Sequence, residues 1–306
     1  MNNSLGLIVF GFVLGTILGS LAKALADRST KKVSFWGRSY CLSCKRKLAW
    51  YDLFPVLSYL LLKGRCRYCH KKIPSLNLGV EIVLGVTVAF IFASTPSALV
   101  FPMNFTWDNV SLLLDLLFKI FTVVVLAVVF LTDLKTGLIP DRITYPAVLI
   151  SAAYILVSLG LKIWTFYQSI LSSPFGSYLL PPRSHYFSDV VQRLVLNKVW
   201  DISWALGMAL LFVLLIVVTK GRGMGWGDVK FVLFLGLALG FPQIMVALLL
   251  AFLLGAVFSL GLIALGRKSF GQTIPFGPFL SLGAVLAFLW APQILNLYFS
   301  SFKLGY

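Results

Sequence analysis

Long apolar runs set the strongest limit on what this chain can fold into. A helix needs about 20 mostly apolar residues to cross a bilayer, and eight runs approach or exceed that length. They cover residues 4–26, 79–101, 111–132, 143–162, 200–219, 229–241, 243–265 and 279–299. The sixth run is short and Phe241-Pro242 separates it from the seventh, so these two are expected to form a tight hairpin. The sequence predicts an all-α polytopic membrane protein with about eight transmembrane helices.

The overall composition agrees with a membrane location. The 306 residues are 59% hydrophobic and only 12% charged, and their mean hydropathy is +0.93, which no water-soluble domain of this length shows. The net charge of +16 would suit nucleic acid, but the basic residues lie in loops between apolar runs. Anionic lipids and membrane topology explain that pattern better, so we expect lipid contacts and no nucleic-acid partner. The oligomeric state is unknown from the sequence.

The distribution of lysine and arginine predicts the orientation. Segment 27–78 holds twelve basic residues and two acidic ones, and three further loops add seven basic residues. These loops lie near 133–142, 220–230 and 266–270. The positive-inside rule places them in the cytosol of a cell (inner) membrane, so eight spans leave both termini and loop 163–199 outside. No basic segment precedes the first run, which is expected to be kept as a span rather than cleaved.

All four cysteines lie in the basic segment, as two Cys-x-x-Cys pairs with 21 residues between them. They are Cys41, Cys44, Cys66 and Cys69. This spacing fits a tetrahedral Zn²⁺ site, and the role should be structural because four thiolates leave no open position. Two disulfides or free thiols are the alternative, although a reducing cytosol disfavours disulfides.

Two aspartates stand where apolar runs meet basic, glycine-rich loops. Asp133 closes the third run and Asp228 opens the sixth. A carboxylate at that depth is costly unless it is paired or functional. Two carboxylates that meet can share a proton, one activating water and the other polarising a scissile carbonyl, as in an aspartic protease. The alternative is helix capping, which Asp141, directly after Pro140, fits best.

The residues around Asp228 support a peptide site. Gly223, Gly225 and Gly227 let backbone approach closely, so an extended substrate can lie against this loop. Lys230 either favours the ionised form of Asp228 or is a lysine at the membrane edge.

Four ordered segments resemble the prepilin peptidase (type IV leader peptidase) family, membrane aspartic proteases of the Gly-x-Gly-Asp type. They are the cysteine segment 40–69, the stretch 133–141 ending in Ile-Pro-Asp, Gly-Trp-Gly-Asp-Val-Lys at 225–230, and Thr-Ile-Pro-Phe-Gly-Pro-Phe at 273–279. The resemblance implies that Asp133 and Asp228 are the catalytic pair. It also implies a supporting role for Asp141 and for the motif residues Gly225, Gly227 and Lys230. Residues 1–26 would be the first transmembrane helix, 27–78 a cytosolic zinc-binding domain and 79–306 the membrane catalytic domain with about seven helices.

The resemblance further implies the reaction. Family members cleave the basic leader from type IV prepilins and pseudopilins after a glycine, at the cytosolic face, for type IV pili or type II secretion. Many also N-methylate the new terminus with S-adenosylmethionine, but no residue here can be assigned to that cofactor. The family often has Phe-Leu-Asn after the Gly-Ser of its first helix, whereas this chain has Leu21-Ala22-Lys23. This departure leaves methylation and substrate preference open.

Two other functions fit parts of the pattern. A presenilin-like intramembrane aspartic protease also uses Gly-x-Gly-Asp, but it lacks the paired cysteines. It also carries Pro-Ala-Leu where this chain has Ile-Pro-Phe-Gly-Pro at 274–278. An ion-coupled transporter would place its acids near the bilayer midplane on broken helices, whereas these aspartates stand at the ends of apolar runs.

Overall fold

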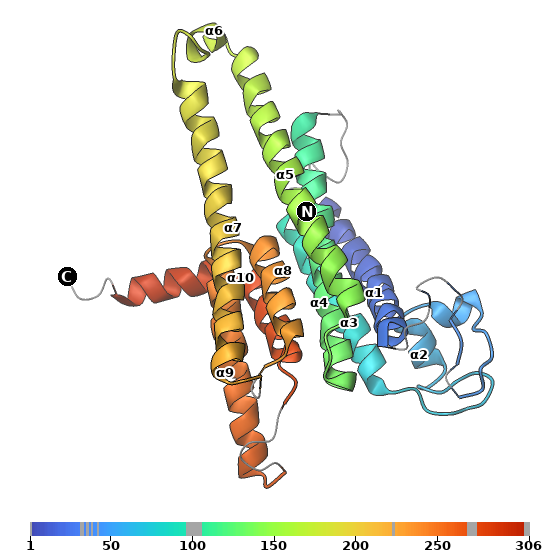
Figure 1. The fold of residues 1–306 in the computed structure, drawn as a ribbon. Helices are drawn as coiled ribbons and strands as arrows, with labels where there is room; N and C mark the ends of the chain where they lie inside the picture. The colour runs from blue at the N-terminus through green and yellow to red at the C-terminus, as the bar shows by residue number, and fades with distance from the viewer. Residues whose placement is uncertain are drawn as a thin grey trace. The chain divides into compact units, whose positions relative to one another are not determined.

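The computed structural model describes residues 2–30, 34, 37, 39–41, 43–95, 106–221, 224–267 and 274–302. Within these residues the chain is helical, without strands and with two isolated β-bridges. The helices, drawn in Figure 1, are α1 (Asn2–Thr30), η1 (Trp50–Leu53), α2 (Leu57–Leu61), α3 (Ser75–Ser94), α4 (Trp107–Thr136), α5 (Asp141–Leu171), α6 (Gly176–Leu179), α7 (Tyr186–Val218), α8 (Trp226–Leu239), α9 (Gln243–Ala264) and α10 (Gly277–Phe302). The all-helical prediction is confirmed.

The chain forms two compact units. The first unit contains α1, the cysteine segment, α3 and residues 116–136 of α4. The second contains residues 107–115 of α4 together with α5 to α10. The predicted domain boundaries are different, since they join α3 and all of α4 to the later helices. Compact units need not coincide with functional domains, so the three-part division stays a prediction.

Glycines spaced by four residues bring α1 and α3 together in the first unit. A Cβ on Gly15 would lie 2.5 Å from the Leu84 carbonyl oxygen and 2.8 Å from the Gly85 Cα. Gly11 meets α3 nearer its end and Gly19 meets it at Glu81, so the two helices run antiparallel. Because only glycine permits this distance, the Gly-x-x-x-Gly spacing makes a backbone-to-backbone interface of the kind common in membranes.

In the second unit, α8 is the central helix. It contacts α5, α7, α9 and α10, and Phe231, Val232, Phe234 and Leu235 are all 0% exposed. A Cβ added to Gly236 would lie 2.6 Å from the Ala205 Cα, which shows how closely α8 approaches α7. A helix that is apolar on every side is expected in such a buried position.

Seven of the described helices are long and apolar enough to cross a membrane. They are α1, α3, α4, α5, α7, α9 and α10. The remaining predicted run corresponds to α8, whose 14 residues give a length of about 21 Å, less than the roughly 30 Å hydrocarbon core. The turn at Phe241-Pro242 joins α8 to α9, as the sequence predicts.

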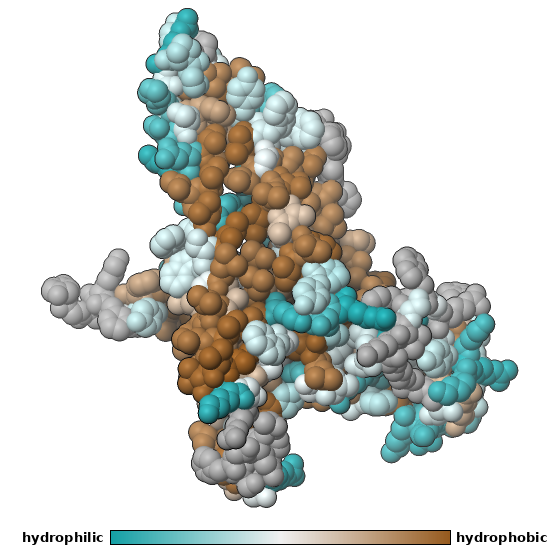
Figure 2. All heavy atoms as spheres, in the orientation of Figure 1, coloured by the Kyte–Doolittle hydropathy of each residue, from teal (hydrophilic) through white to brown (hydrophobic). Residues whose placement is uncertain are grey.

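The expected external loop 163–199 is largely helical. α5 continues to Leu171 and α7 begins at Tyr186, so only 172–185, with α6, lies between them. Helices of 31 and 33 residues measure about 47 and 50 Å and exceed the hydrocarbon core. Figure 2 shows hydrophilic residues gathered where these two helices approach α6 and many apolar residues farther from that end.

Candidate active site and metal centre

Asp133 lies in the last turn of α4. Its residue is 4% exposed, and the neighbouring Thr132 is fully buried. The last turn of a helix presents carbonyl oxygens and the negative end of the helix dipole, which disfavour a carboxylate there. Helix capping therefore does not explain this aspartate.

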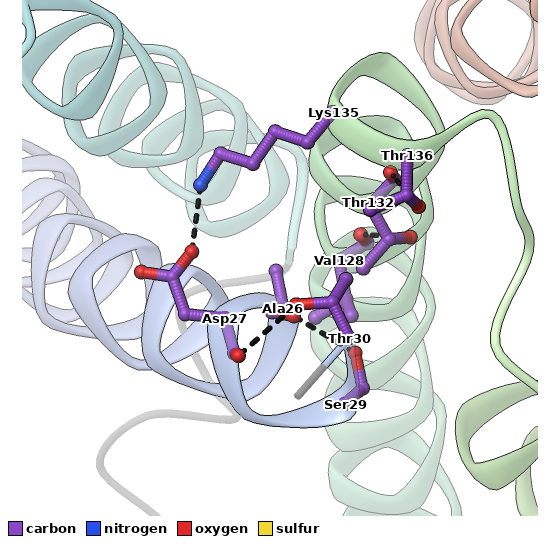
Figure 3. A network of polar contacts seen from close by, with 8 residues as sticks. All are labelled: Ala26, Asp27, Ser29, Thr30, Val128, Thr132, Lys135 and Thr136. Carbon is purple, nitrogen blue, oxygen red and sulfur yellow. Dashed lines mark hydrogen bonds and ion pairs between the residues drawn. The ribbon is translucent and has the colours of Figure 1, made fainter. Parts of the chain in front are cut away.

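An ion pair anchors this end of α4 to α1 within the first unit. Lys135 Nζ lies 2.7 Å from Asp27 Oδ1, and Figure 3 shows the lysine reaching from α4 to the aspartate near the end of α1. The Thr136 hydroxyl donates to the Thr132 carbonyl at 2.8 Å. The turn that carries Asp133 is thus held both by its own helix and by α1.

Asp228 is the third residue of α8 and is 9% exposed. The Gly225 N–H donates to its Oδ2 at 3.0 Å, and the Asp228 N–H donates to the Gly225 carbonyl at 3.1 Å. These bonds satisfy a backbone donor at the helix start. Gly225, not Asp228, holds the N-cap position, and Asp228 caps the helix from its third position through one carboxylate oxygen. The same bond fixes the orientation of the side chain.

Lys230 forms its ion pair with Asp141. Its Nζ lies 2.8 Å from Asp141 Oδ1 and 4.6 Å from the centre of the Tyr145 ring. Asp141 is the first residue of α5, and Pro140 rather than Asp141 holds the N-cap position. Because Asp141 is 58% exposed, the pair contributes little to stability. Its effect is to join the beginnings of α5 and α8.

The two motif glycines in the described chain have different surroundings. A Cβ on Gly227 would lie 3.0 Å from the Ile139 Cβ, whereas the nearest atom to one on Gly225 is Asp228 Oδ2 at 3.7 Å. Gly227 therefore lets α8 approach the connection before α5. Gly223 lies outside the described residues.

We expect Gly227→Ala to be more damaging than Gly225→Ala. The first substitution crowds Ile139, and overpacking costs about 1–3 kcal/mol. The second loses a preference at the N-cap that is worth less than about 1 kcal/mol. Thermal unfolding of the two purified variants in one detergent checks this order, and equal melting temperatures would contradict it.

The structure brings five of the predicted site residues together in the second unit. They are Asp141, Gly225, Gly227, Asp228 and Lys230. Asp133 belongs to the first unit. Its pairing with Asp228 stays a prediction.

The four cysteines form one cluster. Their sulfur atoms all lie within 4.8 Å of one another, and those of Cys41 and Cys69 are 3.8 Å apart. Tetrahedral bonds of about 2.3 Å from a zinc ion to thiolates require sulfurs about 3.8 Å apart, so the cluster fits such a metal. The predicted grouping is confirmed, and the exposed His70 is not a member of the cluster.

The two cysteine pairs have the same local structure. The Cys41 N–H donates to the Arg46 carbonyl and the Cys66 N–H to the Lys71 carbonyl, each at 3.0 Å. The residue after each second cysteine has a left-handed backbone conformation, with φ 59° for Lys45 and 53° for His70. Each turn directs two sulfurs to one point.

The thiols of Cys41 and Cys69 have different pKa values. The pKa of Cys41 is lowered to about 6, chiefly because the Cys44 backbone N–H stabilises its thiolate. For Cys69, the Lys71 N–H lowers the pKa, but burial and the other three thiols outweigh that effect and raise it to about 11. Four adjacent thiolates repel one another, and a bound cation removes this repulsion.

Several residues at the site have no signal in the sequence. Asp27 pairs with Lys135, and Tyr145 lies beside Lys230. The Val56 N–H donates to Glu81 Oε2 at 2.8 Å. Each of these contacts joins residues that are far apart in the sequence. Glu81 thus accepts a hydrogen bond from the residue directly before α2. Asp52 meets Arg67 at 2.7 Å, as its basic surroundings suggest.

Comparisons with known proteins match both parts of the chain. The Bacterial Peptidase A24 N-terminal domain matches residues 13–95, and the Type IV leader peptidase family matches residues 120–260. No solved structure matches the chain.

Full-length relatives extend these matches. A "Prepilin leader peptidase/N-methyltransferase" from Aeromonas salmonicida is 32% identical over 265 residues, which are 86% of this chain and 75% of that protein. A protein of the same name from Bacillus subtilis is 27% identical over 94% of this chain and 96% of its own length. The chain therefore belongs to the type IV leader peptidase family.

Proposed function

We propose that this chain is a membrane aspartic endopeptidase that removes the basic leader from type IV prepilins or pseudopilins. Asp133 and Asp228 would be its catalytic pair. The observation that carries this proposal is the burial of both acids, 4% and 9% exposed, at the ends of apolar helices. The names of the relatives from Aeromonas salmonicida and Bacillus subtilis support the substrate class.

The proposed chemistry needs one ionised and one protonated carboxyl group. The ionised group takes a proton from water, while the protonated group polarises the carbonyl of the bond after the leader glycine and then protonates the leaving amine. The bond from Gly225 to Asp228 fixes one of the two groups. Gly225 would further leave backbone accessible to an extended substrate.

The cysteine cluster would hold one structural Zn²⁺. The four thiolates complete its coordination, so the ion supplies folding energy and no catalytic position. The basic segment around this cluster would lie at the cytosolic face beside anionic lipids. Both termini would lie outside with α8 as an eighth, short crossing in addition to the seven long helices. The catalytic ends of α4 and α8 would then lie at the same face.

Methylation of the new N-terminus is a second candidate activity. It rests on the names of the relatives, which include N-methyltransferase. S-adenosylmethionine would supply the methyl group, and no residue is assigned to it. Mass spectrometry of the mature pilin, produced with and without this cofactor, tests the activity.

A cleavage assay tests the proposed peptidase function. Membranes that contain the chain are expected to convert a leader-bearing pilin precursor to the mature form, and a precursor with the leader glycine replaced should remain uncut. Failure to process the precursor, with cleavage of a transmembrane segment that has no basic leader, would instead favour a presenilin-like protease.

Asp141→Asn is expected to reduce processing partially, by roughly tenfold, a loss of about 1.4 kcal/mol of transition-state stabilisation. The substitution weakens the ion pair to Lys230 that joins α5 to the start of α8. Initial cleavage rates measure the effect. Asp108→Asn is the control because Asp108 is also exposed in the first turn of a helix. Complete loss would make Asp141 a member of the catalytic pair.

A further inference from the structure

A cavity of about 270 Å³ lies in the first unit, between the end of α1, the start of α3 and the segment that carries the cysteines. Its lining includes Asp27, Asp52 and Glu81, three of the ten acidic residues in the whole chain. Such a concentration is unexpected within a segment dominated by lysine and arginine.

Two basic residues, Lys23 and Arg28, also line the cavity. The Arg28 guanidinium already donates to the Gly37 carbonyl at 2.7 Å. Asp27 itself is paired with Lys135. Among the three acids of the lining, Asp52 is the one that has a buried carboxylate oxygen without a hydrogen-bond partner in the described part of the chain.

Asp52 has one satisfied and one unsatisfied oxygen. Arg67 Nε lies 2.7 Å from Oδ1, and the Asp52 side chain is only 3% exposed. Its Oδ2 is buried and has no hydrogen-bond partner among the described residues. A buried acceptor left unpaired is costly, and more so when it carries charge. A donor with a positive charge would remove that cost.

The rest of the lining suits an organic cation. Tyr59 and Phe54 offer aromatic surfaces, and Ser58 and Asn77 offer side-chain oxygens. Aromatic faces attract ammonium and guanidinium groups, and several acceptors satisfy their multiple N–H donors. The volume is just below the roughly 300–1,000 Å³ of small-molecule pockets, so one extended side chain is a suitable occupant.

The position of the cavity connects it with Asp133. Asp27 lines the cavity and holds Lys135, which stands two residues after Asp133 in the last turn of α4. A chain bound in the cavity would therefore lie beside the end of the helix that carries one proposed catalytic acid. Figure 3 shows this connection between α1 and α4.

We propose that the cavity binds a lysine or arginine side chain of the substrate leader, with Asp52 as its principal acidic partner. This inference rests on the proposed function for the identity of the substrate. It gives a basic leader a local acidic site within a segment whose other charges would repel it.

Binding of a fluorescent leader peptide to the purified full chain in detergent tests the proposal. Asp52→Asn should weaken binding of a lysine-containing peptide about tenfold or more. It should leave binding of the same peptide with glutamine in place of lysine unchanged. Asp189→Asn is the matched control because Asp189 is an exposed aspartate in the first turn of α7.

Two further variants separate binding from a structural role of Asp52. Arg67→Gln removes the ion pair but keeps Asp52, so binding of the basic peptide should be retained or strengthened. Asn77→Lys places a resident cation in the lining and should weaken binding of the basic peptide selectively. If Arg67→Gln weakens binding as much as Asp52→Asn, the ion pair is structural and the proposal is wrong.

The remaining outcomes are also decisive. Unchanged binding of the lysine peptide to both Asp52→Asn and Asn77→Lys would overturn the proposal. Displacement of the peptide by S-adenosylmethionine, another organic cation, would instead assign the cavity to the methyl donor. Because the readout is binding, a leader that binds through Asp52 but is never cut would contradict the peptidase function and leave this proposal intact.

Discussion

Replacing either Asp133 or Asp228 by asparagine is expected to lower leader cleavage by roughly a hundredfold to ten thousandfold, the usual contribution of a positioned acid or base. Asparagine has nearly the same size as aspartate but cannot exchange a proton with water or with the leaving amine. Both side chains are buried at helix ends, so bulk water cannot easily replace them. The initial rate of pilin maturation in membranes measures the loss.

The double variant should be no slower than the slower single variant, because two acids that act as one unit are not additive. Asp189→Asn serves as the control for the loss of a carboxylate elsewhere. Zinc content and gel-filtration behaviour show whether each variant is folded. Full processing by both single variants would remove the aspartic-protease mechanism.

Replacing Cys66 or Cys41 by serine is expected to remove the bound metal and lower the yield of folded protein. Structural zinc contributes about 10–16 kcal/mol in small zinc-binding peptides, and a site with three thiolates loses much of that energy. Cys66 is 5% exposed, so its replacement also places a hydroxyl group in a buried position. Metal analysis of the purified chain measures the change directly.

Ser43→Ala is the matched control for this prediction. Ser43 lies between Cys41 and Cys44, is exposed and is not part of the sulfur cluster. The variant should keep about one zinc ion per chain. Metal content that is unchanged in the cysteine variants would contradict a four-cysteine site.

Apolar runs and cysteine spacing predicted much of the architecture. Helix position follows from hydropathy because a span must satisfy its backbone within itself, so the eight runs correspond to eight helices. The cysteine cluster follows from short loops that fix two sulfurs at a time. Helix ends were less predictable, and α5 and α7 extend far into the segment expected to be loop. Hydropathy marks only the apolar part of a helix, whereas the helical backbone continues through the polar residues that adjoin it.

The surroundings of the two aspartate motifs were only partly predictable. Their residue types placed Asp133 and Asp228 at helix ends, as the structure confirms. No pattern in the sequence assigns Lys230 to Asp141, which is 89 residues away, or distinguishes the surroundings of Gly227 from those of Gly225. Those distinctions depend on which backbone approaches each residue.

Hydropathy and short-range spacing act within one segment, so they were enough to predict a helical membrane protein with a four-cysteine cluster and aspartates at two helix ends. The folded structure was needed to show that Lys230 meets Asp141, that Gly227 faces Ile139 and that Asp52 lines a cavity. Such contacts join residues far apart in the chain, and their formation depends on the packing of whole helices rather than on local preference.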